Sequence, residues 1–329
     1  MIREESAPVQ DSHVREDSHV RDDSQRGSEK KLGNENSKFI KFNSWLKTSI
    51  NAEQGNVRKT MEDRTMVSNF QYKNKDYYIH CLCDGHGSVT TCDMIVERFT
   101  PTFQKYLVKH HGSQIRKVID DTFVDLHNQV RKLNLDSGST ISLLLIIDKN
   151  KKKQLQIWSA NVGDSAAYGI TEHDKKVRIQ KITTDHNLEN KSEKARLDKM
   201  SGFRFQDGYI VAPTGDAINM SRAIGDLTFE GAVLPNPSIR KLTKPYSIFI
   251  ISSDGIWDVV SPKVLWAKLC PPKERQAWRF SAERLNTWRN QNFKQHDNTS
   301  LMIIYVDYEK YNRESTCQNS PSAELRDPC

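Results

Sequence analysis

Short apolar runs bounded by turn residues recur along the chain and indicate a protein built largely from β-strands. Each run is continuously apolar rather than alternating, which predicts strands that are covered on both faces. The predicted strands cover residues 77–83, 141–147, 155–160, 248–252 and 301–306. Only a short lysine-rich segment separates the second run from the third, so we expect these two runs to pair as an antiparallel hairpin.

Three further segments carry helix signals. Ser113 is a capping candidate, and apolar residues follow it at spacings of three and four as far as Leu133. A second helix is expected to begin at Pro262, because proline fits the first helical position, and a third covers roughly residues 189–201, ending before a glycine. Strands buried on both faces and a few long helices predict an α+β fold, a sandwich of two mainly antiparallel β-sheets flanked by α-helices.

The two ends of the chain lack this pattern. Hydrophobic residues make up 36% of the 329 residues, and the terminal segments contain few large apolar side chains. We therefore expect a disordered charged leader over 1–38, a folded catalytic domain over 39–308 and a disordered tail over 309–329. The leader carries a six-residue repeat that includes His13 and His19; its low hydrophobicity favours disorder over metal binding.

Composition and charge exclude several classes of function. No apolar run approaches the roughly 18 residues of a membrane span, and the first twenty residues have no apolar signal region. We therefore expect an intracellular protein, cytoplasmic or nuclear or both, without a membrane partner. The net charge is +7, but the lysine cluster at 149–153 lacks interleaved aromatic residues and fits a hairpin turn better than a nucleic-acid site.

The cysteines and the lack of a heptad pattern bear on the redox state and the oligomeric state that we expect. The six cysteines form no C-x-x-C pair, and we expect all of them to be reduced thiols. Because no segment has a heptad pattern, a monomer is the default expectation.

Four acidic stretches at the ends or edges of the predicted strands carry the candidate chemistry. They read RKTMED at 58–63, CDGHGS at 83–88, SSDGIWD at 252–258 and HDNT at 296–299. Carboxylate oxygens without a cysteine or histidine set favour Mg²⁺ or Mn²⁺ over Zn²⁺, and bound cations offset the repulsion between clustered carboxylates. If the first stretch is extended, Arg58 and Glu62 share one face, where the guanidinium can bind a phosphate beside a metal-bound carboxylate.

These motifs stand in the order found in a known family. Over about residues 40–308 the chain resembles the metal-dependent serine/threonine protein phosphatases of type 2C. The matching motifs are QGNVRKTMED at 54–63, DGHG at 84–87, SGST at 137–140, ANVGDS at 160–165, TDH at 184–186, SRAIGD at 221–226, SDGIWD at 253–258 and DNTS at 297–300. Any one of them is weak alone, and their shared order makes coincidence implausible.

The resemblance implies a binuclear metal site at one end of the sandwich, holding two Mg²⁺ or Mn²⁺ ions. In such enzymes Asp84 would bridge both ions. Glu62 and the Gly85 carbonyl would hold one ion, and Asp254 and Asp297 would hold the other.

The resemblance also implies the reaction. Arg58 would bind the substrate phosphate, His86 would be the general acid, and Asp63 would orient metal-bound water. Asp164, Asp254 and Asp258 match positions that can hold a third, weaker ion in some relatives. The implied activity is hydrolysis of phosphoserine and phosphothreonine in proteins by a metal-bridged water, without a covalent phosphoenzyme.

Some positions depart from the family pattern. Ala166 stands where relatives commonly have arginine, and the segment 212–220 replaces a glycine-rich one, which bears on the flap at 185–220 rather than on the metal ligands. A catalytically inactive relative that binds phosphoproteins as a scaffold is the alternative, although every implied carboxylate ligand is present. We interpret Trp266, Trp278 and Trp288 as helix core rather than as a peptide dock.

Overall fold

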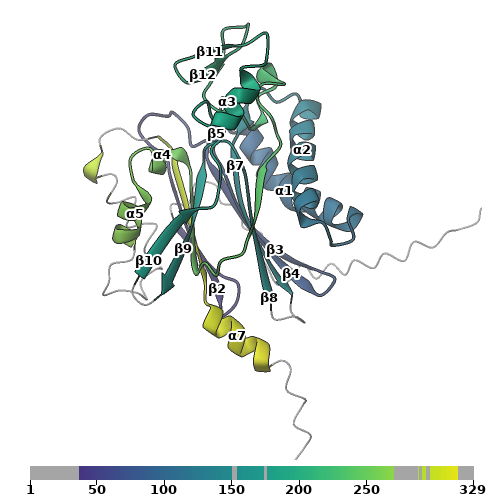
Figure 1. Cartoon of the computed structure of the whole chain (residues 1–329), viewed down its shortest axis with the longest axis vertical. Helices are drawn as coiled ribbons and strands as arrows, with labels where there is room; N and C mark the ends of the chain where they lie inside the picture. Colours follow the sequence, from purple (N-terminus) through teal and green to yellow (C-terminus); the bar gives the residue numbers. More distant parts are fainter. Residues whose placement is uncertain are drawn as a thin grey trace, which may run out of the picture.

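Two antiparallel sheets face each other in the computed structural model of the chain, which describes residues 37–149, 154–173, 176–269, 288, 291–293 and 297–317 (Figure 1). The first sheet has six strands in the order β1-β2-β17-β16-β9-β10. Its strands are β1 (Ser37–Lys41), β2 (Leu46–Glu53), β9 (Ala166–His173), β10 (Lys176–Lys181), β16 (Ile248–Ser252) and β17 (Thr299–Val306).

The second sheet has five strands in the order β15-β8-β7-β4-β3. Its strands are β3 (Arg64–Tyr72), β4 (Lys75–Cys83), β7 (Ile141–Lys149), β8 (Gln154–Val162) and β15 (Ser238–Leu242). β7 and β8 pair antiparallel with Ile141 opposite Val162, which confirms the predicted hairpin. Most of the lysine-rich segment that joins them, residues 150–153, lies outside the described residues.

Apolar side chains cover both faces of both sheets, as the continuous runs predicted. The core between the sheets includes Leu46, Ile50, Leu144, Ile146, Met302 and Ile304. Helices α1 (Thr90–Lys109) and α2 (Ile115–Leu133) pack on the outer face of the five-stranded sheet (Figure 1). Helices α4 (Asp254–Trp257) and α5 (Pro262–Leu269) pack on the outer face of the other sheet. The predicted α+β sandwich flanked by helices is confirmed.

Some of the predicted helices agree with the structure and others do not. α2 and the start of α5 were predicted correctly, except that the N-cap of α2 is Gln114 rather than Ser113, whereas α1 was not predicted. The helix expected over 189–201 is shorter, since α3 covers only Lys191–Leu197. Trp266 and Trp288 are half-buried against the cluster under α5, as expected of helix core, and Trp278 lies outside the described residues.

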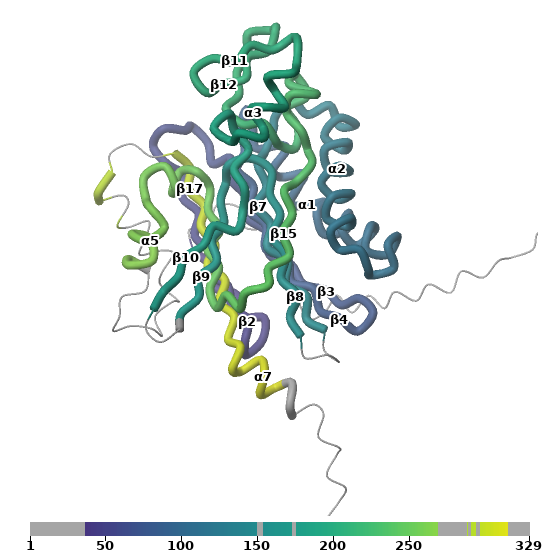
Figure 2. Tube along the Cα trace, viewed as in Figure 1, coloured from purple at the N-terminus to yellow at the C-terminus, as the bar shows by residue number. Residues whose placement is uncertain are grey.

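A lobe at one end of the sandwich carries α3 and three short strands (Figure 2). These strands are β11 (Arg204–Gln206), β12 (Tyr209–Val211) and β13 (Ala217–Ile218). The lobe has its own apolar cluster, which includes Leu197, Ile210 and Phe229; Phe229 ends the 3₁₀ turn η2 (Leu227–Phe229). Between the lobe and the sandwich lies a small sheet in the order β14-β6-β5. It consists of β5 (Gly85–His86), β6 (Gly138–Ser139) and β14 (Ile224–Gly225).

The predicted disordered tail from residue 309 is wrong for its first part. Helix α7 covers Tyr308–Cys317, and Tyr311 is only 4% exposed. Its ring packs edge-on against Trp45 at 5.0 Å between centroids, and its hydroxyl donates to Asp148 Oδ1 at 2.8 Å. The first part of this segment therefore docks on the sandwich, at the end opposite the lobe (Figure 1).

The predicted leader lies almost entirely outside the described residues, apart from Ser37 and Lys38, which belong to β1. Ser37 and Lys38 thus belong to a strand rather than to the predicted leader. No helix in the described part of the chain is both long and apolar enough to cross a membrane.

Candidate active site

The predicted site residues of the five-stranded sheet lie at the end of the sandwich that carries the lobe. Glu62 and Asp63 come directly before β3, and Asp84 comes directly after β4. The first residue of β3, Arg64, pairs with the last residue of β4, Cys83. This register brings the acidic residues of the two segments together across neighbouring strands.

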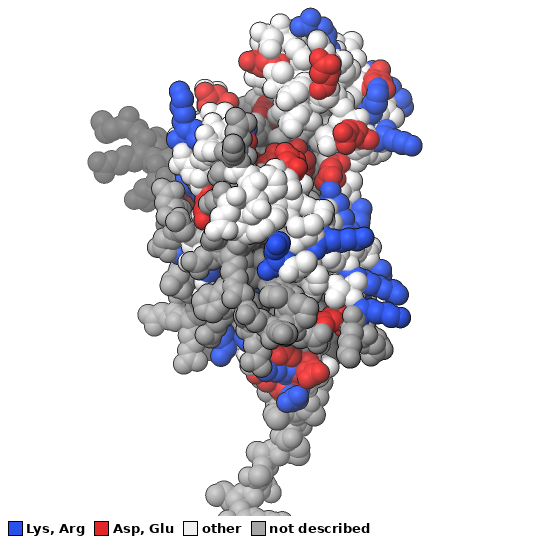
Figure 3. Space-filling model, turned by 90° about the vertical axis from the view of Figure 1, so that its left-hand side faces the viewer, with Lys and Arg blue, Asp and Glu red and all other residues white. Residues whose placement is uncertain are grey.

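The six-stranded sheet contributes its carboxylates at the same end. Asp254 follows the end of β16, and Asp297 precedes the start of β17. Ser252, the last residue of β16, pairs with Leu301 near the start of β17. In Figure 3 acidic side chains gather beside a hollow beneath the lobe.

Two glycines let the backbone segments of the site approach each other closely. A Cβ on Gly85 would lie 2.8 Å from both the Glu62 carbonyl oxygen and the Cys92 sulfur. A Cβ on Gly255 would lie 2.2 Å from the carbonyl oxygen of Asn298, the residue after Asp297. Each Asp-Gly pair therefore brings its own carboxylate next to another acidic segment, because no side chain separates the two backbones.

Burial and mutual repulsion act strongly on these carboxylates. Burial, followed by the charges of Asp63, Asp254 and Asp164, raises the pKa of Asp84 well above its usual range. Burial also raises the pKa of Asp63 to about 7, although Ser253 Oγ donates to Asp63 Oδ2 at 2.9 Å. Each of these groups is therefore destabilised in its ionised form unless a positive charge compensates it.

The remaining predicted carboxylates belong to the same electrostatic cluster. Burial and the charge of Asp254 raise the pKa of Asp164 to about 6. Burial, followed by the charges of Asp254 and Asp297, raises the pKa of Asp258, and burial raises that of Asp254 itself. All predicted carboxylates other than Glu62 are thus linked directly, and Glu62 acts on Arg58 beside them.

The donor set fits hard divalent cations. Among the described residues, no three His, Cys, Asp or Glu side chains already stand in a metal-binding arrangement. The buried oxygens Asp63 Oδ1 and Asp164 Oδ1, however, make no hydrogen bond within this part of the chain. Oxygen ligands that repel one another and lack hydrogen-bond partners are the environment that Mg²⁺ or Mn²⁺ would stabilise.

Arg58 reaches this cluster from the loop between β2 and β3. Residues 54–63 contain no strand, so the extended stretch that would place Arg58 and Glu62 on one face is absent. Instead, Arg58 Nε donates to Asp297 Oδ1 at 2.9 Å and to Oδ2 at 3.0 Å. The hydrogen bond with Asp297 raises the pKa of Arg58 further, against the effect of burial. The structure thus places Arg58 beside Asp297, one of the predicted metal ligands.

His86 lies beside the carboxylates in β5 and has a partner that sequence analysis did not assign. Its Nε2 lies 2.7 Å from Asp226 Oδ1. Burial lowers the pKa of His86, but the charge and hydrogen bond of Asp226 outweigh this effect, so that the pKa is raised. Asp226 belongs to the SRAIGD motif, which was recognised as a match without a role for this residue.

Comparison with known proteins identifies the family. The profile of the Protein phosphatase 2C family matches residues 48–267, two thirds of the chain. The chain belongs to the protein phosphatase 2C family. The family assignment made from the ordered motifs is therefore confirmed.

Relatives from plants and yeasts share modest identity with this phosphatase 2C chain. The probable protein phosphatase 2C 52 of Oryza sativa subsp. japonica is 26% identical over 210 residues, which cover 62% of this chain and 40% of that protein. Protein phosphatase 2C homolog 1 of Schizosaccharomyces pombe is 24% identical over 233 residues, which cover 69% of this chain and 64% of that protein. The chain thus spans less than two thirds of the length of either relative.

A solved structure of the family shares the fold. The crystal structure of serine-threonine phosphatase 2C from Toxoplasma gondii superposes with a TM-score of 0.67 at 16% sequence identity. The superposition covers 85% of this chain and 99% of that one. At this identity the likeness confirms the fold of the phosphatase 2C chain and leaves its substrate open.

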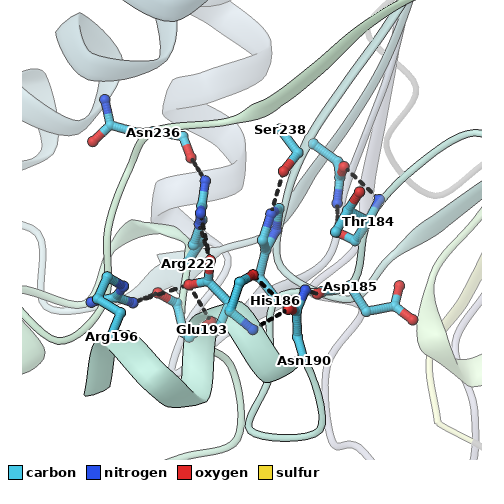
Figure 4. A network of polar contacts seen from close by, with 12 residues as sticks. Thr184, Asp185, His186, Asn190, Glu193, Arg196, Arg222, Asn236 and Ser238 are labelled. Atoms are coloured by element: carbon cyan, nitrogen blue, oxygen red, sulfur yellow. Dashed lines mark hydrogen bonds and ion pairs between the residues drawn. The ribbon is translucent and has the colours of Figure 1, made fainter. Parts of the chain in front are cut away.

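A second polar network joins the lobe to the sandwich of this phosphatase 2C fold (Figure 4). Glu193 of α3, whose side chain is 3% exposed, pairs with Arg222 and Arg196. It also accepts a hydrogen bond from Ser221 Oγ at 2.9 Å. Burial alone would raise the pKa of Glu193, but its hydrogen bond and ion pair with Arg222 lower it to about 2. Glu193 is therefore ionised and fixes the base of the lobe.

The same network reaches the loop that carries Asp164. His186 Nε2 lies 2.8 Å from Ser238 Oγ at the start of β15, as Figure 4 shows. The His186 backbone N–H donates to the carbonyl of Gly163 at 3.1 Å, next to Asp164. Sequence analysis matched the TDH and SRAIGD motifs without finding this role, because Glu193 belongs to neither motif.

Proposed function

We propose that the protein is a metal-dependent phosphatase that hydrolyses phosphoserine and phosphothreonine in proteins. The observation that carries the proposal is the convergence of acidic residues from both sheets with Arg58 and His86 at one end of the sandwich. Family membership supports the reaction class. The relatives carry phosphatase names, and the substrate class follows from those names rather than from the site.

The carboxylates of this cluster are proposed to hold the metal ions. Glu62, Asp84 and the Gly85 carbonyl would hold one Mg²⁺ or Mn²⁺ ion. Asp84, Asp254 and Asp297 would hold the second. When bound, the ions supply positive charge that stabilises the phosphoryl oxygens, and they acidify water for attack on phosphorus. A third, weaker ion is proposed to use Asp254 together with Asp164 and Asp258.

Arg58 is proposed to bind the substrate phosphate. Its Nε is the atom that contacts Asp297, and its side chain is 51% exposed. The two terminal nitrogens have no hydrogen-bond partner among the described residues, so they are available for two parallel hydrogen bonds to phosphate oxygens. Asp297 fixes the guanidinium in this position.

His86 is proposed to protonate the departing serine or threonine oxygen. Asp63, which accepts a hydrogen bond from Ser253 Oγ, is proposed to orient water at the metal site when the ions are bound. A cysteine nucleophile has no support within the described residues, because Cys81, Cys83 and Cys92 are all buried. Burial raises the pKa of the Cys92 thiol well above its usual range, which disfavours the thiolate that such a mechanism needs.

The test is hydrolysis of a phosphothreonine peptide by the purified full chain. We expect turnover with millimolar Mg²⁺ or Mn²⁺, complete loss with excess chelator, and recovery when the metal is restored, because all implied ligands are oxygen atoms. Full activity in excess chelator would overturn the metal-dependent assignment. A folded protein that binds Mn²⁺ and the phosphopeptide yet shows no turnover would instead support the inactive scaffold.

A further inference from the structure

The Asp226 carboxylate lies against His86 and is not among the predicted metal ligands. Asp226 Oδ1 is 2.7 Å from His86 Nε2, and the Asp226 side chain is 7% exposed against 25% for His86. We propose that Asp226 is a positioning residue for proton transfer, which orients the His86 ring so that Nδ1 delivers the proton to the leaving oxygen. The inference rests on the proposed function, because it refines the role of the same histidine.

The small sheet β14-β6-β5 builds this contact. Gly138 of β6 pairs with His86 on one side and with Gly225 on the other. Asp226 follows Gly225 directly, so its carboxylate reaches His86 across Gly138. A Cβ on Gly138 would lie 2.2 Å from Asp226 Oδ2. The glycine of the SGST motif therefore makes room for the carboxylate.

The backbone around Asp226 is held in an unusual conformation. Asp226 has φ +55 and Gly225 has φ +95, and left-handed backbone is uncommon at a residue other than glycine. The Gly225 N–H donates to the buried Nδ1 of His127 at 3.2 Å. A Cβ on Gly225 would lie 2.3 Å from the carbonyl oxygen of Ser137. Close packing and this hydrogen bond thus fix the direction in which the Asp226 side chain leaves the backbone.

The Asp226 carboxylate does not take the role that its position usually has. Asp226 is the N-cap residue of η2, yet its side chain makes no capping hydrogen bond there. Aspartate at an N-cap normally accepts from the first backbone N–H groups, which stabilises the turn. Its Oδ2 is also buried without a hydrogen-bond partner among the described residues. Both features disfavour stability and are expected of a carboxylate that is placed for the histidine.

The contact determines which ring nitrogen can act. The Asp226 carboxylate is hydrogen-bonded to His86 Nε2. His86 Nδ1 has no hydrogen-bond partner within the described residues, so Nδ1 is the ring nitrogen that can face the substrate. In the proposed step the phosphorus–oxygen bond breaks with its electron pair going to the serine or threonine oxygen. That oxygen takes the proton from Nδ1, whose N–H electron pair stays on the ring. Asp226 keeps its hydrogen bond to Nε2 throughout, as in other aspartate–histidine pairs.

Asp226→Asn in the full chain, assayed with saturating Mn²⁺, tests this role. Asparagine tolerates left-handed backbone and keeps the side-chain shape, but its neutral amide cannot support the histidine in the same way. We expect kcat on a phosphothreonine peptide to fall by about 10-fold or more, with KM within about twofold. The loss on p-nitrophenyl phosphate should be much smaller, because p-nitrophenolate departs without protonation. If Asp226→Asn does not fold, Asp226→Gly, which also accepts positive φ, is measured in its place.

The double variant His86→Gln/Asp226→Asn separates positioning from a structural effect. If Asp226 acts through His86, adding Asp226→Asn to His86→Gln should cause no further loss on the phosphopeptide, since interacting residues are not additive. The matched control is Asp121→Asn, because Asp121 Oδ2 lies 2.7 Å from His110 Nε2 on the remote helix pair. This variant should leave activity on both substrates unchanged.

The outcomes distinguish the inference from the proposed function. Equal losses on both substrates for Asp226→Asn, or additive losses in the double variant, would overturn the positioning role. If His86→Gln itself fails to distinguish the two substrates, the proposed general acid is wrong. If His86→Gln distinguishes them and Asp226→Asn does not, His86 keeps its role and only the inference about Asp226 fails.

Discussion

At the scale of single residues, Arg58 links the proposed phosphate-binding position to the proposed metal-ligand cluster, because its Nε donates to Asp297 while its side chain is 51% exposed. Arg58→Ala should lower kcat/KM for a phosphothreonine peptide by about 10- to 100-fold, the range expected when a charge-assisted pair of hydrogen bonds is lost. Removal of an arginine that contacts phosphate in both the ground and transition states should raise KM, and it should also lower kcat if the contact is stronger in the transition state.

Steady-state kinetics at saturating metal measure this effect. Arg313→Ala is the control, because Arg313 lies in α7 with its side chain 77% exposed. Unchanged kcat and KM in Arg58→Ala would remove Arg58 from the phosphate site.

Asp84 is a buried carboxylate whose acidic neighbours oppose its ionised form, and its replacement by a neutral isostere should separate its contribution to metal binding from its contribution to folding. Asp84→Asn should abolish turnover and weaken Mn²⁺ binding by about tenfold or more, since a bridging ligand contacts both ions. The metal-free variant should be at least as stable as the wild type at neutral pH, because burial and the charges of Asp63, Asp254 and Asp164 oppose the ionised form.

Titration calorimetry and thermal unfolding in chelator check the two halves of this prediction. Asp198→Asn serves as the control, since Asp198 is the C-cap residue of α3 and its side chain is 50% exposed. Unchanged Mn²⁺ affinity in Asp84→Asn would contradict the proposed bridging role.

Most of the site could be predicted from the sequence because its motifs are local. An Asp-Gly pair at the end of a strand can be recognised in the sequence itself. The order of the motifs, which matches that of the family, then indicates the role of each pair. Asp226 and Glu193 were missed for a different reason. Asp226 meets His86 across 140 positions of sequence, and Glu193 meets Arg222 across 29. Only the fold brings such partners together, and neither residue has a local pattern that reveals them.

At the scale of elements, α7 shows that a largely polar sequence can still dock through its tyrosines, since both Tyr308 and Tyr311 pack on the core between the sheets. Tyr311→Phe should lower the free energy of unfolding by about 1–3 kcal/mol, because the buried Asp148 carboxylate loses a hydrogen-bond donor. Burial raises the pKa of Asp148, and the Tyr311 hydroxyl opposes that shift. The variant therefore leaves a buried charge less well compensated.

Urea unfolding monitored by tryptophan fluorescence measures the loss. Glu309→Ala on the same helix is the control, since its side chain is 85% exposed, and it should stay within about 0.5 kcal/mol of the wild type. A Tyr311→Phe variant as stable as the wild type would mean that the hydroxyl contributes nothing to docking of the helix.

Strands and helices could be predicted where their burial leaves a recognisable pattern of apolar residues in the sequence. Strands covered on both faces remain continuously apolar, which is why β4, β7, β8, β16 and β17 were visible in the sequence. Helix α1 lacked the usual signals, because its N-cap is Val89, without a side-chain cap, and Pro101 lies inside it. The lobe strands β11–β13 are two or three residues long, too short for any period to appear.

At the scale of the whole molecule, the sandwich carries the candidate site at one end and α7 at the other. The lobe closes over the site end and is tied to the sandwich by polar contacts rather than by a continuous sheet. Glu193, Arg222 and His186 form these ties (Figure 4), and each connects residues that are distant in sequence. Stability of the fold therefore depends on buried ionisable groups as well as on the apolar core.

Two buried histidines make the whole fold sensitive to acid. Burial lowers the pKa of His80 to about 3, and burial followed by the charge of Arg222 lowers that of His186 to about 4. A histidine whose folded-state pKa lies below its unfolded value of 6.5 takes up its proton only on unfolding as the pH falls. Each histidine therefore favours the unfolded chain increasingly below pH 6.5, down to its own folded-state pKa. The raised pKa values of Asp63 and Asp164 act in the opposite direction, so a variant must isolate the histidine.

His80→Gln should show this contribution as a change in pH dependence. The variant should be less stable than the wild type at pH 7, because Thr48 Oγ1 lies 2.9 Å from His80 Nε2 in a fully buried site. The gap should narrow by about 1.4 kcal/mol per pH unit below pH 6.5, roughly 2 kcal/mol by pH 5, because only the wild type carries the titrating group. Urea unfolding in chelator at pH 7 and pH 5 measures the gap at each pH, with His111→Gln on the exposed turn after α1 as the control. A gap that is equal at both pH values would mean that His80 takes up its proton in the folded protein, and that its burial does not make the fold sensitive to acid.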